Sequence, residues 1–139
     1  MLKESNLEKK LEKELLSTTC RKNEEEREQV KVFDWIREQI KTYPRLMLAF
    51  HIPNGGIRNI VAATRLKRAG VKAGMPDICI PLARYEANGL WIEMKSENGR
   101  LSDEQKVIHA FLRSEGHLVY TCYSAKTAIE IIKNYLDLV

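Results

Sequence analysis

The chain has few cysteines and no long apolar run, and both features limit what it can be. Its three cysteines are widely spaced, without a Cys-x-x-Cys pair, and the chain has three histidines. An odd number of separated cysteines argues against a disulfide framework and indicates reduced, cytoplasmic thiols. No spacing typical of zinc ligands joins cysteines to histidines. No transmembrane helix is predicted, because a membrane span needs about 18 or more consecutive apolar residues. The charged start "MLKESNLEKKLEKELL" does not have the pattern of a signal peptide.

Length and composition predict one domain that follows a short arm. With 139 residues, 44% of them hydrophobic, the chain can build one core and is too short for two ordinary domains. Residues 1–22 are expected to form a charged helical arm, with Leu7, Leu11 and Leu15 on a narrow stripe and a break at "STTCRKN". Residues 23–139 are expected to form the folded domain. The sequence contains no repeats and no low-complexity segments.

Acidic residues are absent from one long stretch. Residues 1–41 hold ten basic and ten acidic side chains, whereas residues 39–76 hold seven basic ones and no Asp or Glu. A field of this sign suits a phosphate backbone, although a solvated basic helix is the usual explanation of such a run. The turn "PNGG" offers backbone N–H groups to a phosphate, or is a plain turn. The predicted nucleic-acid contacts are Asn54, Arg58, Arg65, Lys67, Arg68 and Lys72.

The apolar periodicity predicts an α/β domain with the element order α-β-α-β-β-α-β-α. A helix over residues 24–41 is expected to turn Val32, Phe33, Ile36 and Ile40 inward. "RLMLAFHI" predicts a buried strand, on which His51 would be a core histidine. A helix over residues 57–69, ending at Gly70, is expected to bury Ile57, Ile60 and Val61.

The C-terminal half carries clearer boundary signals. Ser102 is expected to cap a helix running to about residue 115, with Gly116 as its stop. Its predicted inward residues are Val107, Ile108, Phe111 and Leu112. "HLVYTCY" predicts a strand, and Ser124 is expected to cap the last helix.

Two short runs, "DICIPL" and "LWIEMK", carry three charged residues. In the second run Glu93 and Lys95 lie on one face of a strand and the apolar residues on the other. With a turn at Asn88-Gly89, the runs predict an antiparallel hairpin over residues 77–95 that brings Asp77 beside Glu93 and Lys95. Trp91 shares this face, where it packs under a helix or stacks on a base; packing is the expectation.

The chemistry of these three residues fits a metal-dependent hydrolase. Two carboxylates at one strand edge repel unless a cation joins them, and hard oxygen ligands suit Mg²⁺ or Mn²⁺. A neighbouring lysine can orient or help deprotonate a water, which fits phosphodiester hydrolysis. A surface hairpin with solvated charges is the alternative, because Glu-x-Lys is common. The flanking residues favour the metal site.

Four segments resemble the virus-type replication-repair nuclease (VRR-NUC) domain of the PD-(D/E)XK nuclease superfamily. They are "HIPNGGIRN", "LKRAGVKAGMPDICIP", "LWIEMKSENGRLSDEQ" and "FLRSEGHLVYTCYSAKTAIEII", and the resemblance covers roughly residues 24–135. It implies an α/β restriction-endonuclease-like fold with a mixed central sheet flanked by helices. It also implies catalytic Asp77, Glu93 and Lys95, with Mg²⁺ (or Mn²⁺ in its place) held by Asp77, Glu93 and the Met94 carbonyl.

The resemblance implies two further catalytic residues. Family members carry a helix Glu four residues before a Gln, and "EEREQ" supplies Glu25 and Gln29. Glu28, about 60° away around the helix, is the alternative, and an acidic first turn that suits the helix dipole explains most of the cluster. Gln105 either closes a capping box with Ser102 or lies at the active site, and both can hold.

The expected function is therefore a Mg²⁺-dependent DNA endonuclease, specific for branched DNA of the Holliday-junction type. A non-catalytic nucleic-acid-binding module and an RNA nuclease are the alternatives. Small members resemble phage resolvases, which implies a homodimer in the cytoplasm of a bacterial host and no membrane association.

Overall fold

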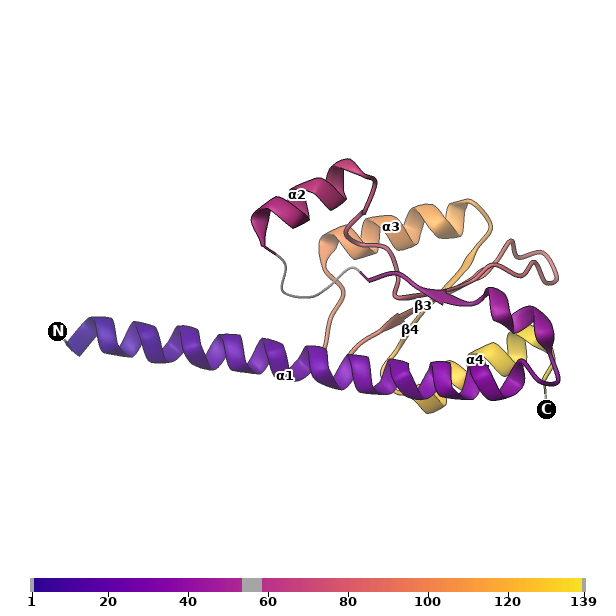
Figure 1. The fold of residues 1–139 in the computed structure, drawn as a ribbon, viewed down its shortest axis with the longest axis horizontal. Coiled ribbons are helices and arrows are strands. Elements are labelled where there is room, and N and C mark those ends of the chain that lie inside the picture. Colours follow the sequence, from indigo (N-terminus) through magenta and orange to yellow (C-terminus); the bar gives the residue numbers. More distant parts are fainter. Residues whose placement is uncertain (1, 54–58, 139) are drawn as a thin grey trace.

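A mixed four-stranded sheet lies between two layers of helices (Figure 1). The computed structural model describes residues 2–53 and 59–138, and side chains in these ranges except those of residues 2–5 and 7. The strands are β1 (Phe50–His51), β2 (Ile78–Ile80), β3 (Leu90–Met94) and β4 (Leu118–Cys122), in that spatial order. β1–β2 and β2–β3 pair antiparallel, and β3–β4 pair parallel. The expected mixed sheet is confirmed.

The helices divide between the two faces of the sheet. α1 (Leu2–Gln39) and α4 (Ala125–Leu136) cover one face, and α3 (Asp103–Ser114) covers the other, with α2 (Ile60–Arg68) at the periphery of that side (Figure 1). A short 3₁₀ helix, η1 (Pro44–Leu48), joins α1 to β1. No helix in the described part of the chain is long and apolar enough to span a membrane.

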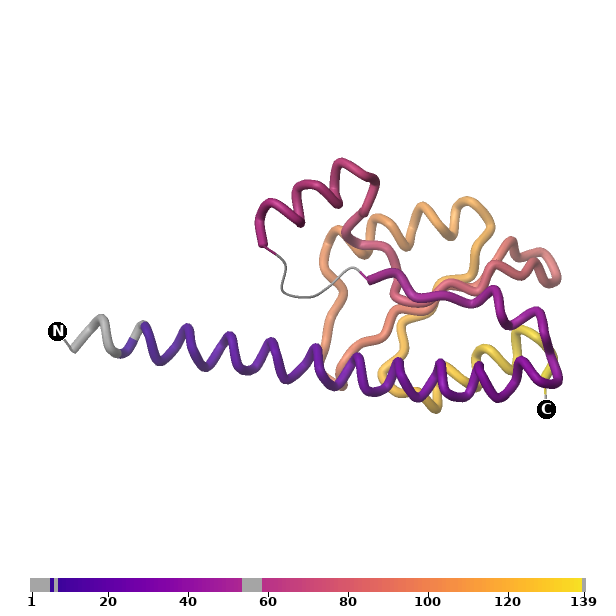
Figure 2. The backbone as a smooth tube through the Cα atoms, viewed as in Figure 1, coloured from indigo at the N-terminus to yellow at the C-terminus, as the bar shows by residue number. Residues whose placement is uncertain are grey.

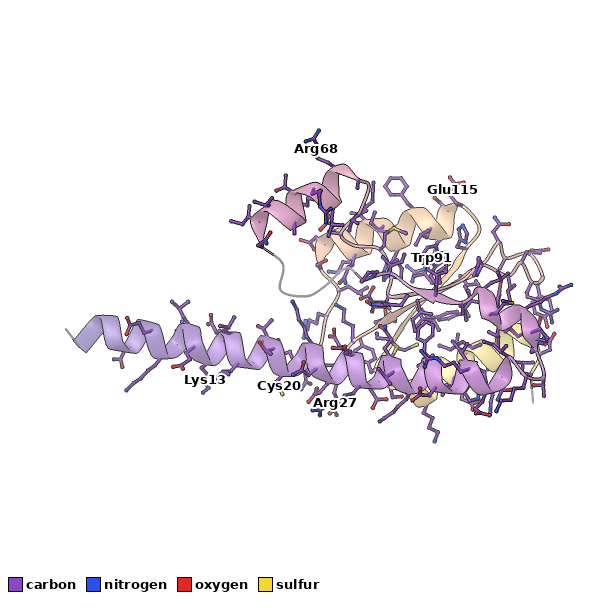
Figure 3. All side chains as sticks on the ribbon, in the orientation of Figure 1. Lys13, Cys20, Arg27, Arg68, Trp91 and Glu115 are labelled. Carbon is purple, nitrogen blue, oxygen red and sulfur yellow. The ribbon has the colours of Figure 1, made fainter. Side chains whose placement is uncertain are left out.

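Strand alternation divides the core between the two faces of the sheet. Ile78, Ile80 and Ile92 are fully buried against α1 and α4. On the other face, Cys79, Trp91 and Val119 form a smaller cluster against Leu112 of α3. Trp91 thus packs under a helix, as expected, and its side chain appears between the sheet and α3 in Figure 3.

α1 is one continuous helix of 38 residues, so the predicted break at "STTCRKN" is wrong. The segment holds no Gly or Pro, and its hydroxyls find partners inside the helix. Thr18 and Thr19 donate to the carbonyls of Glu14 and Leu15, which satisfies groups that would otherwise favour a turn. The backbone follows a single straight path beyond the folded body (Figure 2). Lys13 and Cys20 stand on this projecting part, away from the rest of the chain (Figure 3).

The predicted buried strand "RLMLAFHI" is also wrong. Pro44 opens the 3₁₀ helix instead, because its fixed φ and missing N–H suit a helix start. Leu46 is the buried residue of η1, and both residues of β1 are exposed. His51 is therefore not a core histidine; its Nδ1 lies 2.7 Å from the Asp77 carbonyl oxygen.

α2 differs from its prediction in start and orientation. It begins at Ile60 behind Asn59, whose side chain accepts a hydrogen bond from the Ala62 N–H. Ile60 is 84% exposed and Val61 is similarly exposed, so neither faces a core. The expected inward position of Ile57 lies outside the described residues. Gly70, with φ of 104°, follows the helix as predicted.

α3 has the predicted cap but a different buried stripe. Ser102 and Gln105 form the capping box, and Gly116 follows the helix with φ of 82°. Val107 and Phe111 are exposed rather than inward. The fully buried residue of the helix is His109.

The predicted hairpin forms, but its tight turn lies elsewhere. Arg84 pairs with Ala87 around Tyr85, whose φ is 53°. Asn88 instead binds the end of α3: its N–H donates to the Gly116 carbonyl, and its side-chain amide donates to the Glu115 carbonyl. Because Asn88 is held by these two carbonyls at the end of α3, Asn88-Gly89 does not form the hairpin turn.

Candidate active site

Asp77 and Glu93 meet at one end of the hairpin. β2 and β3 pair Ile78 with Ile92, and continuing this register by one residue sets Asp77 opposite Glu93. Asp77 Oδ2 accepts a hydrogen bond from the Met94 N–H at 2.8 Å, which ties the carboxylate to β3. Glu93 is only 3% exposed. The proximity predicted from strand alternation is therefore present.

Burial makes this pair of carboxyl groups hard to ionise. It raises the pKa of Glu93 to about 9, with the Asp77 charge as the next cause, while Lys95 acts in the opposite direction. Burial also raises the pKa of Asp77, while the bond from the Met94 N–H acts in the opposite direction. A buried carboxyl beside a half-buried one favours sharing a proton unless a cation neutralises them. The pair thus has the electrostatics of a cation site.

Lys95 lies beside the pair. Its Nζ is 3.8 Å from Glu93 Oε1, and its side chain is 13% exposed. The Lys95 N–H donates to the Cys122 carbonyl at 2.9 Å, so the β3–β4 pairing fixes the backbone from which the ammonium projects. Its charge opposes the raised pKa of Glu93.

Of the two candidate glutamates on α1, Glu25 points toward this site. Its Oε1 accepts a hydrogen bond from the Ser96 N–H at 3.2 Å, and its charge contributes to the raised pKa of Glu93. Glu28 turns toward α4, where its Oε2 accepts from the Ala125 N–H at 2.7 Å. A bond from Lys31 lowers the pKa of Glu28, and the bond from Ala125 adds to this effect. Glu28 therefore caps α4.

Gln105 closes the predicted capping box and also contacts Glu93. Its Oε1 accepts from the Ser102 N–H at 2.9 Å, which completes the capping box. Its Nε2 donates to Glu93 Oε1 at 3.0 Å. One amide thus fixes the start of α3 and orients Glu93.

The predicted nucleic-acid contacts lie apart from the carboxylates, on and after α2. Arg65, Lys67, Arg68 and Lys72 are exposed, and Arg68 extends outward from α2 (Figure 3). Asn54 and Arg58 lie outside the described residues. The Met94 side chain is buried in the opposite face, and metal binding by its carbonyl stays a prediction.

His109 is the site neighbour that the sequence analysis missed. It is 0% exposed, and its Nε2 lies 3.6 Å from Glu93 Oε2. Burial lowers the pKa of its imidazole, and the Arg113 and Lys95 charges lower it further, so the ring is neutral near pH 7. A signal was present, because His109 follows Gln105 by one helical turn and shares its stripe.

Comparisons with known proteins agree with this arrangement. A family model described as the VRR-NUC domain matches residues 8–126. A solved structure described as a VRR_NUC domain protein is 32% identical, with a TM-score of 0.70, and the alignment covers 82% of this chain and 88% of that one. No curated protein matches the chain. With the sheet, the hairpin carboxylates and the lysine in place, the chain belongs to the VRR-NUC family, a nuclease domain of the PD-(D/E)XK type.

Proposed function

We propose that the chain is a Mg²⁺-dependent endonuclease that hydrolyses phosphodiester bonds in branched DNA. The observation that carries the proposal is the buried Glu93 carboxyl, with the half-buried Asp77 opposite it and Lys95 beside it. When both carboxyls are ionised, their repulsion destabilises the fold. A bound cation would neutralise the two charges and could then bind a phosphate oxygen of the substrate.

The residues present fit a hard divalent cation. Asp77 and Glu93 offer carboxylate oxygens, and Glu93 Oε2 is buried without a hydrogen-bond partner among the described residues. Within those same ranges, no group of three His, Cys, Asp or Glu side chains is arranged to hold a metal. Two carboxylates suit Mg²⁺, which is commonly bound by one or two carboxylates and keeps several waters. Asp77, Glu93 and the Met94 carbonyl would hold it, and Mn²⁺ would substitute.

The side chains around this position have distinct tasks. A bound Mg²⁺ supplies charge neutralisation and lowers the pKa of a coordinated water. The Lys95 ammonium orients the attacking water and stabilises negative charge that develops on the phosphate. Gln105 holds Glu93 through Oε1. Glu25, fixed by the Ser96 N–H, borders the site as a further catalytic carboxylate.

The basic residues of α2 are proposed to bind the DNA backbone. Replacing Arg65 or Arg68 by Ala is expected to weaken binding equally for all sequences and to reduce the salt dependence of log K by about one unit each. Fluorescence anisotropy over a salt series measures both effects. Arg37→Ala is the matched control, because Arg37 is also exposed but pairs with Asp34 on α1. If affinity and salt slope stay unchanged when Arg65 and Arg68 are both replaced by Ala, DNA approaches another surface.

Cleavage assays on a panel of substrates test the proposed activity. Four-way junction, flap, nicked, duplex and RNA substrates are compared with and without Mg²⁺. Preferential Mg²⁺-dependent cutting of the junction supports the proposal. Preferential cutting of RNA would favour an RNA nuclease, and tight DNA binding without cleavage would favour a binding module.

We further propose that the protein is a homodimer. Residues 8–22 of α1 project from the folded body (Figure 2), with Leu11 and Leu15 exposed. Most helical stability in proteins comes from tertiary packing of an apolar face, so packing of these leucines against a second copy would stabilise the segment. Two copies also supply two active sites for the two strands of a branched substrate.

The dimer predicts a solution mass of twice 16.1 kDa. Light scattering after gel filtration at micromolar concentration measures it. Leu11→Gln combined with Leu15→Gln should shift the mass toward the monomer, whereas Lys9→Gln with Lys13→Gln, on the same turns, should not. A monomer mass for the wild type, unchanged by junction DNA, would reject the dimer.

A further inference from the structure

Two side chains of α3 lie next to different carboxylate oxygens of Glu93. Gln105 donates to Oε1 at 3.0 Å, and His109 Nε2 lies 3.6 Å from Oε2. The two residues are four apart, so they follow one another on a single helix stripe. α3 is anchored at its start by the capping box. One helix therefore presents two polar groups to one carboxylate.

Hydrogen bonding within the described residues gives His109 no structural role. Neither ring nitrogen has a hydrogen-bond partner among the described residues, and both are buried. Glu93 Oε2 has none there either. Unpaired buried polar atoms destabilise a fold, and an apolar residue of similar size would avoid this cost. The 3.6 Å between His109 Nε2 and Glu93 Oε2 is beyond hydrogen-bond range, and a shift of about half an ångström would bring the two groups into it.

We propose that His109 is a positioning residue, whose Nε2–H donates to Oε2 of Glu93 and fixes this carboxylate for divalent-cation binding. The inference rests on the proposed function, in which Glu93 holds the cation. With Gln105 on Oε1 and His109 on Oε2, rotation of the carboxylate plane is restricted. Each oxygen keeps a second lone pair for the cation. Partners of this kind typically raise metal affinity or activity about 10–100-fold.

His109→Leu and His109→Gln separate positioning from packing. Leu removes the donor, whereas the Gln amide nitrogen can replace Nε2. His117→Leu is the matched control, because His117 accepts from Trp91 Nε1 at 3.3 Å at the other end of this sheet face. Four quantities are measured for each protein: the Mn²⁺ affinity by calorimetry without DNA, the thermal midpoint of the metal-free protein, the cleavage rate, and the DNA affinity by anisotropy.

For His109→Leu we expect about 10–100-fold weaker Mn²⁺ binding, a comparable loss of cleavage and unchanged DNA binding, with a thermal midpoint equal to or above that of the wild type. His109→Gln should recover most of the Mn²⁺ affinity. His117→Leu should lower the midpoint and leave Mn²⁺ affinity unchanged.

Two results would overturn the inference. One is unchanged Mn²⁺ affinity in both His109 variants, whether or not their thermal midpoints fall, because His109 would then be a packing residue. The other is a wild-type electron spin-echo spectrum of bound Mn²⁺ that shows a directly coordinated imidazole nitrogen, because His109 would then be a ligand. If the wild type cuts no nucleic acid while its Mn²⁺ affinity still depends on His109, the proposed function fails and the positioning role stands.

Discussion

Asp77→Asn, Glu93→Gln and Lys95→Ala are each expected to slow DNA cleavage by at least about 10²-fold. The two amide variants remove the negative charge that is proposed to hold the cation. The alanine variant removes the ammonium that lies 3.8 Å from Glu93 Oε1 and is proposed to stabilise charge in the transition state. Because none of the three residues belongs to the basic surface of α2, DNA affinity should change little. Single-turnover cleavage and anisotropy measure the two properties separately.

Glu97→Gln is the control for these variants. Glu97 is exposed in the turn that follows β3. Glu97→Gln therefore removes one negative charge, as Glu93→Gln does, but at a position four residues further along the chain and outside the Asp77–Glu93 pair. It should cut at the wild-type rate. Rapid cleavage by Asp77→Asn or Lys95→Ala, or full wild-type activity in EDTA, would contradict the proposed mechanism.

The hairpin was predictable because strand alternation is a local property. Alternating residues assign Glu93 and Lys95 to one face whatever lies above it, and the pairing of Ile78 with Ile92 then brings Asp77 opposite Glu93. The caps were predictable for the same reason: Ser102 and Ser124 accept bonds from N–H groups three residues ahead. Each of these signals is contained in a few consecutive residues.

The remaining parts depended on packing between distant segments. The sequence "EEREQ" offers several glutamates, and the docking of α1 against Ser96 and of α4 against α1 decides that Glu25, not Glu28, points to the site. Apolar content predicted a strand after Pro44, but the segment lies at the periphery with both β1 residues exposed. His109 was not predicted as a site residue because its burial depends on which side of α3 faces the sheet. The sequence alone does not fix that rotation.

Divalent-cation binding is expected to release about one proton per site near pH 7. Burial and the Asp77 charge raise the pKa of Glu93 to about 9, so the carboxyl is protonated at neutral pH in the metal-free protein. The cation binds the ionised form, and the proton must leave. The apparent affinity should therefore rise by about tenfold per pH unit up to roughly pH 9 and then level off.

The same pKa predicts the stability of the metal-free protein. The pKa of Glu93 is near its ordinary value of 4.5 when the chain is unfolded and about 9 when it is folded, so protonation of Glu93 favours the folded state. This contribution is complete below pH 4.5, and it is lost as the pH rises toward 9. The thermal midpoint should fall over this window, and saturating Mg²⁺ should restore it at the alkaline end. Glu93→Gln, which cannot ionise, should flatten the pH dependence.

Calorimetry in two buffers of different ionisation enthalpy measures the released proton directly. The difference in observed binding heat gives the proton number, and repeating the titration across the pH range gives the slope of affinity. Equal heats in both buffers, with an affinity independent of pH, would mean that Glu93 is already ionised before the cation arrives. Metal binding would then not depend on the charge conflict between Asp77 and Glu93, and the case for this pair as the cation site would rest on proximity alone.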